Sequence, residues 1–235
     1  MGGRARKRAA GRNRLMCTNY RPGSRDFIRE RFGAEADFEY ADDAYPASAV
    51  PIVRARAGSG SGNLECVRAC FGLIPFWSKD TKIARNTYNA RSETVAEKPS
   101  YRRPWRQGQF CLVPMEYFFE PNYESGRAVR WRIERKDGAP FAVAGIWESW
   151  RAPTSEEVIS FSMLTINADG HPVMGRMHAP EDEKRSVVVI EAQDDLHWLR
   201  GDADSARALL QRFCAESYRT IADPRPAARR IARAK

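Results

Sequence analysis

Residues 130–146 read Arg-Trp-Arg-Ile-Glu-Arg-Lys-Asp-Gly-Ala-Pro-Phe-Ala-Val-Ala-Gly-Ile. Two short runs typical of strands, Arg130–Glu134 and Phe141–Ile146, flank the turn signal Lys136-Asp137-Gly138. Similar runs occur at Pro51–Arg54, Leu64–Phe71, Phe110–Val113, Ile159–Ile166 and Ser186–Ile190. Many short strands with few helices indicate an α+β protein. We therefore expect a single domain built on a curled, mainly antiparallel β-sheet, open and barrel-like, with peripheral helices.

Three segments predict helices. Asp202 offers an N-cap for a helix through about Ala215, in which Ala206, Leu209, Leu210 and Phe213 form an i, i+3, i+4, i+7 stripe. Ser24–Phe32 predicts a second helix, and Glu93–Arg102 a short third one.

Composition indicates a cytoplasmic protein without a disulfide framework. Hydrophobic residues make up 43% of the 235 residues, yet no run approaches the roughly 18 apolar residues of a membrane span. The five cysteines are odd in number and scattered. Cys66 and Cys70 lack a second ligand pair, so they predict buried thiols rather than a zinc site, as do Cys111 and Cys214. We expect a monomer with no metal, no cofactor and no membrane contact.

The chain has a basic N-terminal segment. Six arginine and lysine residues, and no acid, stand in the first fifteen residues, so this segment carries much of the net charge of +9. We expect a basic leader over residues 1–16, a domain over 17–222 and a basic tail over 223–235. Loss of the leader would make Cys17 the first residue. An N-terminal cysteine carries an α-amine and a thiol on neighbouring carbons, a pair that condenses with an aldehyde.

Three polar segments contain candidate functional residues. Asn89 and Arg91 offer an amide and a guanidinium to an anion, although the same residues also suit the capped start of a loop. Glu120, behind two phenylalanines and before a proline, would be poorly solvated, which suits a general acid or base; a strand-end glutamate reaching solvent is the alternative. The Gly/Pro-rich loop over 166–180 contains His171 and His178.

Together these segments resemble the SOS response-associated peptidase family, from Met16 to about Pro224. The similarity lies in ordered blocks: Met-Cys at 16–17, Gly-Leu-Ile-Pro-Phe-Trp-Ser-Lys-Asp at 72–80, Asn-Ala-Arg-Ser-Glu-Thr at 89–94, Cys-Leu-Val-Pro at 111–114, Phe-Phe-Glu at 118–120 and Ala-Gly-Ile-Trp at 144–147. Each block alone is weak evidence, but their order along the chain is specific.

The resemblance implies a function and site residues. Family members use an exposed cysteine to trap abasic sites in single-stranded DNA as a covalent adduct. By motif position, Cys17 resembles the nucleophile, Asn89 the residue that holds the cysteine and the opened sugar, and Glu120 the acid or base. In the resemblance, a histidine would assist reversal of the adduct or cleavage of the leader. We assign this role to His178, with His171 as the second choice.

DNA contacts are also implied by the resemblance. Arg91 resembles a phosphate contact, Phe76 and Trp77 an apolar wedge beside the flipped nucleotide, and Arg176 a further contact. Two positions depart from the family pattern: Thr18-Asn19 replaces Gly-Arg after the cysteine, and Pro121 replaces a tryptophan after the glutamate.

The function expected from sequence is therefore a DNA-damage (SOS) response protein. It would bind single-stranded DNA and form a thiazolidine crosslink to abasic sites through Cys17, exposed by autoproteolysis or by loss of the initiator methionine. Two alternatives remain open at this point. The first is a cysteine-dependent peptidase acting on other proteins, and the second is a catalytically degenerate sensor of single-stranded DNA.

Overall fold

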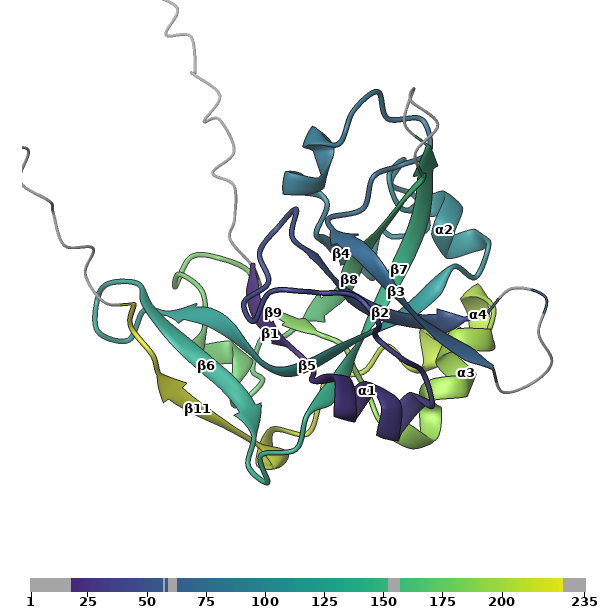
Figure 1. Cartoon of the computed structure of the whole chain (residues 1–235). Helices are drawn as coiled ribbons and strands as arrows, with labels where there is room; N and C mark the ends of the chain where they lie inside the picture. The colour runs from purple at the N-terminus through teal and green to yellow at the C-terminus, as the bar shows by residue number, and fades with distance from the viewer. Residues whose placement is uncertain (1–17, 57, 59–62, 152–156, 226–235) are drawn as a thin grey trace, which may run out of the picture.

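The computed structural model describes residues 18–56, 58, 63–151 and 157–225. Its strands are β1 (Asn19–Pro22), β2 (Ala49–Ala55), β3 (Leu64–Phe71), β4 (Asn89–Arg91), β5 (Phe110–Asn122), β6 (Val129–Arg135), β7 (Phe141–Arg151), β8 (Glu157–Asn167), β9 (Arg185–Val187), β10 (Val189–Ile190) and β11 (Tyr218–Ala222). They form one sheet in the order β10-β7-β8-β3-β2-β5-β6-β11, with β1 on β5 and β4 and β9 on β8 (Figure 1).

The sheet closes on itself because β5 is long enough to pair with different strands along its two halves. Its first half pairs antiparallel with β7, from Phe110 opposite Ile146 to Met115 opposite Phe141, and also contacts β2. The five strands β7, β8, β3, β2 and β5 therefore make a closed ring. Most pairs are antiparallel, whereas β3 and β4 run parallel to β8. The expected single α+β domain with a barrel-like, mainly antiparallel sheet is confirmed, and the ring is closed rather than open.

The second half of β5 leaves the ring. It pairs with β6 on one edge and with β1 on the other, so that Asn19 lies opposite Phe119. Strand β11 then adds to the outer edge of β6. The first described strand and the last described strand are thus brought to the same projecting part of the sheet (Figure 1).

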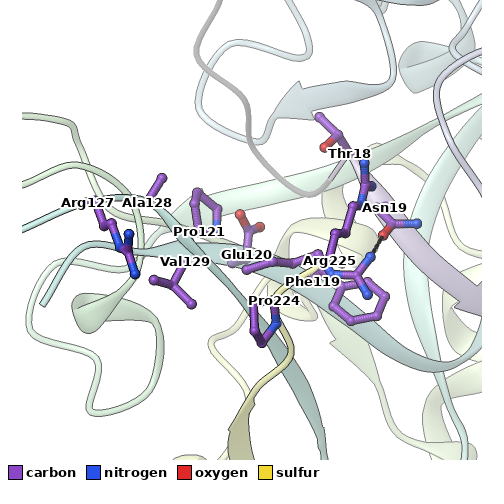
Figure 2. Close-up of a pocket in the computed structure, with 11 residues that line it drawn as sticks. Thr18, Asn19, Phe119, Glu120, Pro121, Arg127, Ala128, Val129, Pro224 and Arg225 are labelled. Carbon is purple, nitrogen blue, oxygen red and sulfur yellow. Dashed lines mark hydrogen bonds between the residues drawn. The ribbon is translucent and has the colours of Figure 1, made fainter. Parts of the chain in front are cut away.

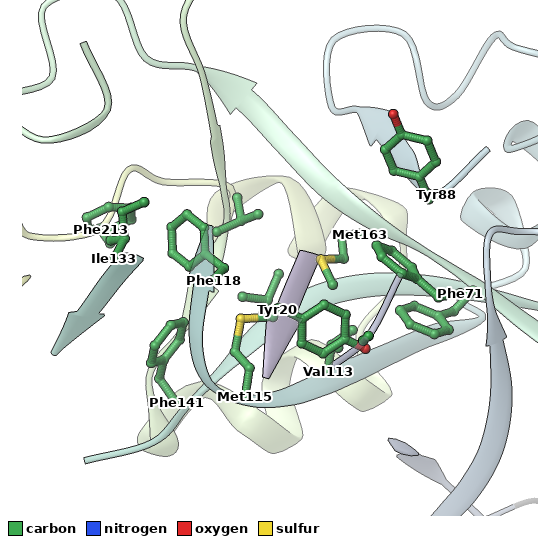
Figure 3. Packing of buried hydrophobic residues seen from close by; sticks show 14 of the residues in the cluster. Tyr20, Phe71, Tyr88, Val113, Met115, Phe118, Ile133, Phe141, Met163 and Phe213 are labelled. Atoms are coloured by element: carbon green, nitrogen blue, oxygen red, sulfur yellow. The ribbon is translucent and has the colours of Figure 1, made fainter. Parts of the chain in front are cut away.

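Apolar residues are buried on both faces of the ring, which explains why its strands are apolar almost throughout. Along β5, Cys111 and Val113 belong to one cluster, and Phe110 and Leu112 belong to the other, as the two-residue period of a strand requires. The first cluster includes Tyr20, Phe71, Phe118 and Phe213 (Figure 3). The second packs under the helices.

The helices are α1 (Arg25–Phe32), α2 (Arg102–Arg106), α3 (Asp195–Arg200) and α4 (Ala203–Ala208), with 3-10 turns at η1 (Lys82–Asn86), η2 (Met174–Arg176), η3 (Ala192–Asp194) and η4 (Ala215–Ser217). The helix predicted from Ser24 is confirmed: the Ser24 hydroxyl accepts a hydrogen bond from the Phe27 amide, and Gly33 ends the helix at φ 61°.

The helix predicted to run from Asp202 to Ala215 is correct only in its first half. Asp202 does cap α4, but the helix ends at Ala208. Ala206 packs in the second cluster, whereas Phe213 packs in the first, 4.3 Å from the Tyr218 ring. One helical stripe cannot face two separate cores, so the chain leaves the helix between them.

The short helix predicted over 93–102 was also wrong. These residues form turns, and α2 begins only at Arg102. Glu93 instead pairs with the buried guanidinium of Arg185, at 2.7 and 2.9 Å. Pro99 has no amide hydrogen to donate to a helix.

The cysteines differ in exposure. Cys111 is buried as expected, and burial raises the pKa of its thiol. Cys66 and Cys70 are partly buried, and burial raises the pKa of both; for Cys66 the value is about 12. Cys214 is exposed, so the expectation that it is buried was wrong. Cys214 lies in the segment where the predicted helix is absent.

In the described part of the chain, no helix is long and apolar enough to cross a membrane.

Candidate functional site

A hollow of about 490 Å³ lies where the start of β1, the end of β5 and the segment after β11 meet (Figure 2). Its walls consist of Thr18, Asn19, Phe119, Glu120, Pro121, Arg127, Ala128, Val129, Arg130, Pro224 and Arg225. Hollows of this size suit small organic ligands. We refer to it below as the Glu120 pocket.

Glu120 is a buried carboxylate. It lies two residues after Phe118 on β5 and so shares the face that Phe118 directs into the core, with only 3% of its surface exposed. Burial of an unpaired charge is costly, and Glu120 lies against His178: Nε2 of the imidazole is 3.1 Å from Oε2 of the carboxylate. The histidine is 5% exposed, so the two form a buried pair.

The ionisation of His178 depends on this pairing. Burial lowers the pKa of the imidazole, but the Glu120 carboxylate raises it by more, and the net result is a pKa above the ordinary 6.5. The neighbouring carboxylate therefore favours the protonated form of the imidazole. Such a pair can accept a proton on one member and hold it beside a reacting group.

Backbone geometry holds His178 in place. Its φ is 65°, a left-handed value unusual for a residue other than glycine. Its amide donates a 2.7 Å hydrogen bond to the Pro121 carbonyl, and Nζ of Lys184 donates to the His178 carbonyl at 3.2 Å. Strained backbone of this kind often accompanies functional side chains. Glu120 and Pro121 thus hold the side chain and the main chain of the same histidine.

Arg130 ties the beginning and end of the described chain to the pocket wall. Its Nη1 donates to Oδ1 of Asn19 at 3.0 Å, its Nε donates to the Asp223 carbonyl at 3.0 Å, and its Nη2 lies 3.3 Å from the Asp223 carboxylate. The guanidinium also stacks over Phe119, 3.7 Å from the ring centroid. Asn19 is itself buried and donates to the Ala44 carbonyl at 3.2 Å.

His171, the second candidate histidine, is engaged elsewhere. Its Nδ1 accepts hydrogen bonds from the amides of Val173 and Met174, and its Nε2 lies 2.9 Å from the Phe213 carbonyl. These contacts require the tautomer with a proton on Nε2 and use both ring nitrogens. Of the two histidines, His178 is the one beside Glu120.

Asn89 and Arg91 lie on β4, outside the lining of the Glu120 pocket. The Asn89 carbonyl accepts a hydrogen bond from Tyr101, and Nη1 of Arg91 forms a 2.7 Å ion pair with Glu183. An aromatic layer connects this strand with β1, because Tyr88 and Tyr20 both contact the Phe71 ring, at 5.8 and 5.4 Å (Figure 3).

Phe76 and Trp77 project from the loop after β3. They are 54% and 49% exposed, although large apolar side chains are usually covered. The guanidinium of Arg103 lies 4.4 Å from the Phe76 ring, and the Trp150 indole donates to the Ser78 carbonyl at 2.8 Å. The loop is thus anchored while its two aromatic tips face outward.

Arg176 is already paired. It makes two 2.8 Å contacts with Glu124 and lies 5.2 Å from the Trp131 ring centroid. A phosphate would compete with that carboxylate for the guanidinium.

Among the described residues, no group of three or more histidine, cysteine or acidic side chains is close enough to hold a metal ion.

Cys17 falls outside the described residues, and Thr18 is the first residue that lines the pocket. Sequence reasoning missed Asn19, Arg127, Arg130 and Arg225 as pocket residues. Arg130 appeared only as the start of a strand, and Arg225 as part of a basic tail. No local signal distinguishes these arginines from the many other arginines of the chain, since their positions depend on the pairing of β6 with β11 and β5.

Comparison with curated proteins finds relatives of known name. Over 150 residues the chain is 31% identical to the abasic site processing protein YoqW of Bacillus subtilis, which covers 62% of this chain and 63% of the relative. It is 26% identical over 156 residues to the mouse abasic site processing protein HMCES, covering 52% and 44%. The chain thus spans less than two thirds of the length of these relatives.

Solved structures share the whole fold. A protein from Bordetella bronchiseptica superposes with a TM-score of 0.81 at 32% identity, covering 88% of this chain and 99% of that one. A Bacteroides thetaiotaomicron protein at 23% identity, with a TM-score of 0.74, shares the fold. The family model described as SOS response associated peptidase (SRAP) matches residues 14–224. Sequence, fold and family model agree, and the chain belongs to the SOS response associated peptidase family.

Proposed function

We propose that this protein binds single-stranded DNA and processes abasic sites by forming a covalent thiazolidine crosslink through an N-terminal Cys17. Its curated relatives are named abasic site processing proteins. The observation that carries the proposal is the position of Thr18, the residue after Cys17: it lines the same pocket as Glu120, which pairs with His178.

The proposed reaction uses both groups of the terminal cysteine. The α-amine, with an ordinary pKa of about 7.7–8.0, attacks the aldehyde of the opened sugar and gives a carbinolamine. Loss of water gives an imine, and the thiol adds to the imine carbon to close the five-membered ring. One residue supplies both nucleophiles, which replaces a bimolecular encounter by a high effective concentration.

In this proposal Glu120 moves the protons. Its carboxylate accepts the proton that the attacking amine loses and returns it to the carbinolamine hydroxyl, which leaves as water. His178, 3.1 Å from the carboxylate, would hold Glu120 in position during the attack. Asn89 would hold the cysteine and the sugar, Arg91 and Arg176 would contact phosphates once freed from their carboxylate partners, and Phe76 and Trp77 would form the wedge.

The reaction requires a free α-amine, so residues 1–16 must be absent from the active form. We propose that the protein itself removes the leader, or that translation starts at Met16 and this initiator methionine is then removed. Intact mass spectrometry of purified protein should give a chain that begins at Cys17. Crosslinking by protein that still carries residues 1–16 would contradict the thiazolidine reaction.

Denaturing electrophoresis tests the crosslink directly, with an oligonucleotide that contains one abasic site. A shifted band should form with the wild type and vanish with Cys17→Ala. Cys214→Ala is the matched control, because it removes an exposed thiol distant in sequence and should leave the band intact. A band that survives Cys17→Ala overturns the proposal. Cleavage of unrelated peptides without a band would favour the peptidase alternative, and noncovalent binding alone would favour the sensor.

A further inference from the structure

Three arginines line the Glu120 pocket, and they differ in how their charges are compensated. Arg130 is held by Asp223, with Nη2 3.3 Å from the carboxylate, and its remaining contacts reach Asn19 and Phe119. Its charge is therefore balanced by a carboxylate, and its donors are directed into the wall. Arg130 serves as a structural element of the pocket.

Arg127 and Arg225 are exposed and carry uncompensated charge. Within the described part of the chain, no carboxylate lies within ion-pair distance of either guanidinium. Arg225 is held by a neutral group: Nη2 donates to the Tyr45 hydroxyl at 2.9 Å, and the guanidinium lies 5.2 Å from the Tyr45 ring centroid. Among the residues that the structure describes, Arg127 has one side-chain partner, the Ser125 hydroxyl, which donates to its main-chain carbonyl at 3.3 Å and leaves the guanidinium free.

Glu120, the carboxylate that lines the pocket, can balance at most one of these two guanidinium groups, and it already lies 3.1 Å from His178. The mouth of the pocket therefore has a surplus of positive charge, and an anion is the ligand that such a site favours. Guanidinium groups are well suited to phosphate, because their donors match its oxygens in pairs.

The two arginines lie on opposite sides of the reactive carboxylate. Figure 2 shows Arg127 on one side of Glu120 and Arg225 on the other. Two separated positive charges with an acid or base between them fit a ligand with two separated negative charges and a neutral reacting centre between them. A nucleotide within a DNA strand has that form, since one phosphodiester precedes its sugar and another follows it.

We propose that Arg127 and Arg225 bind the two backbone phosphates that flank the reacting sugar, and so centre that sugar over Glu120. This inference rests on the proposed function and adds two specificity-determining residues to it. Phosphate contacts fix the register of a strand on a protein. With both flanking phosphates held, the sugar between them is the one presented to the pocket.

Salt-dependent binding tests the proposal. The probe is a single-stranded oligonucleotide with a tetrahydrofuran residue, an abasic analogue without the aldehyde, so that only noncovalent binding is measured. Each of Arg127→Gln and Arg225→Gln should reduce the slope of log affinity against log salt concentration by about 0.7, and the double variant by about 1.4. Arg68→Gln is the matched control, because Arg68 is an exposed arginine on β3 outside the pocket.

Neutral backbone positions locate each contact. A methylphosphonate in place of one flanking phosphate should abolish the difference between wild type and Arg127→Gln, and a methylphosphonate on the other flank should abolish the difference for Arg225→Gln. Methylphosphonates several nucleotides away should leave both differences unchanged.

The outcomes separate this inference from the proposed function. If the wild type crosslinks an abasic oligonucleotide but Arg127→Gln and Arg225→Gln bind the analogue as Arg68→Gln does, the phosphate assignment is wrong while the proposed function stands. If the wild type neither crosslinks nor binds, the proposed function has failed.

Discussion

Nε2 of His178 lies 3.1 Å from Oε2 of Glu120, with both side chains buried, and Glu120 lines the same pocket as Thr18. The two residues come from different parts of the chain, a strand of the sheet and an irregular loop. The strand and the loop are joined at two points, because the His178 amide also donates a hydrogen bond to the carbonyl of Pro121, the residue after Glu120. The pair is therefore fixed before any ligand binds.

Titration of His178 by NMR should give a pKa above its ordinary 6.5, because the Glu120 carboxylate outweighs the effect of burial. Glu120→Gln should lower that pKa, since the amide carries no charge. His171, whose ring nitrogens are engaged with main-chain groups, serves as an internal reference in the same spectra. A His178 pKa unchanged by Glu120→Gln would contradict the pairing.

The raised pKa also predicts how stability changes with pH. Because the folded pKa of His178 exceeds the unfolded value, the pair contributes its full stabilisation below about pH 6.5 and loses it as pH rises through the folded pKa. Urea unfolding of the wild type across this range should show the loss, and Glu120→Gln should show less of it. Equal pH dependence in both proteins would count against the pair as its source.

Arg130→Ala should lower the free energy of unfolding by about 2–3 kcal/mol, because it removes bonds to Asn19 and Asp223 together with the contact on Phe119. Arg130→Lys should recover less than half of that loss, since one ammonium cannot reproduce the planar fork. Denaturant unfolding measures both. Full recovery with lysine would show that charge alone matters here.

Phe76→Ala and Trp77→Ala should leave stability within about 0.5 kcal/mol of the wild type, because both side chains are about half exposed. Each should weaken binding to single-stranded DNA by about 1–3 kcal/mol if the aromatic pair contacts bases as proposed. Leu196, 48% exposed, provides the control, and Leu196→Ala should change neither quantity. Equal binding by all three variants would remove the wedge from the proposal.

Gly72→Ala should destabilise the fold by more than about 3 kcal/mol. Its φ is 125°, and an added Cβ would lie 2.0 Å from the main-chain oxygen of Ala84, which no side-chain rotation relieves. Gly138→Ala is the comparison: φ there is 74°, with nothing within 4 Å, and a loss of about 1–2 kcal/mol is expected. In thermal unfolding experiments, the melting temperatures of the two variants should differ by many degrees.

Strand patterns were readable from sequence because apolar residues with turn signals between them are local features. The run at 110–113 was recognised, yet β5 continues to Asn122. The continuation contains Pro114, Glu116 and Glu120, which oppose a strand assignment locally. Pairing with β1 and β6 overrides that preference, and no feature of the segment alone indicates those partners.

Glu120 and His178 were identified as candidates from motif position, but their contact depends on a loop with a left-handed histidine, which a single sequence does not specify. The pocket arginines were missed for a related reason. An arginine in a strand or near a chain end has the same local pattern whether it faces solvent or a site. The distinction lies in long-range pairing, such as that of Arg130 with Asp223.

The bonds from Arg130 to Asn19 and Asp223 also have a consequence for synthesis. Residue 19 leaves the ribosome early, and residue 223 among the last of the described chain, so the pocket wall cannot be completed on a partly made protein. A nascent chain therefore carries Asn19 and Glu120 without the assembled pocket wall, which forms only after translation has passed residue 223.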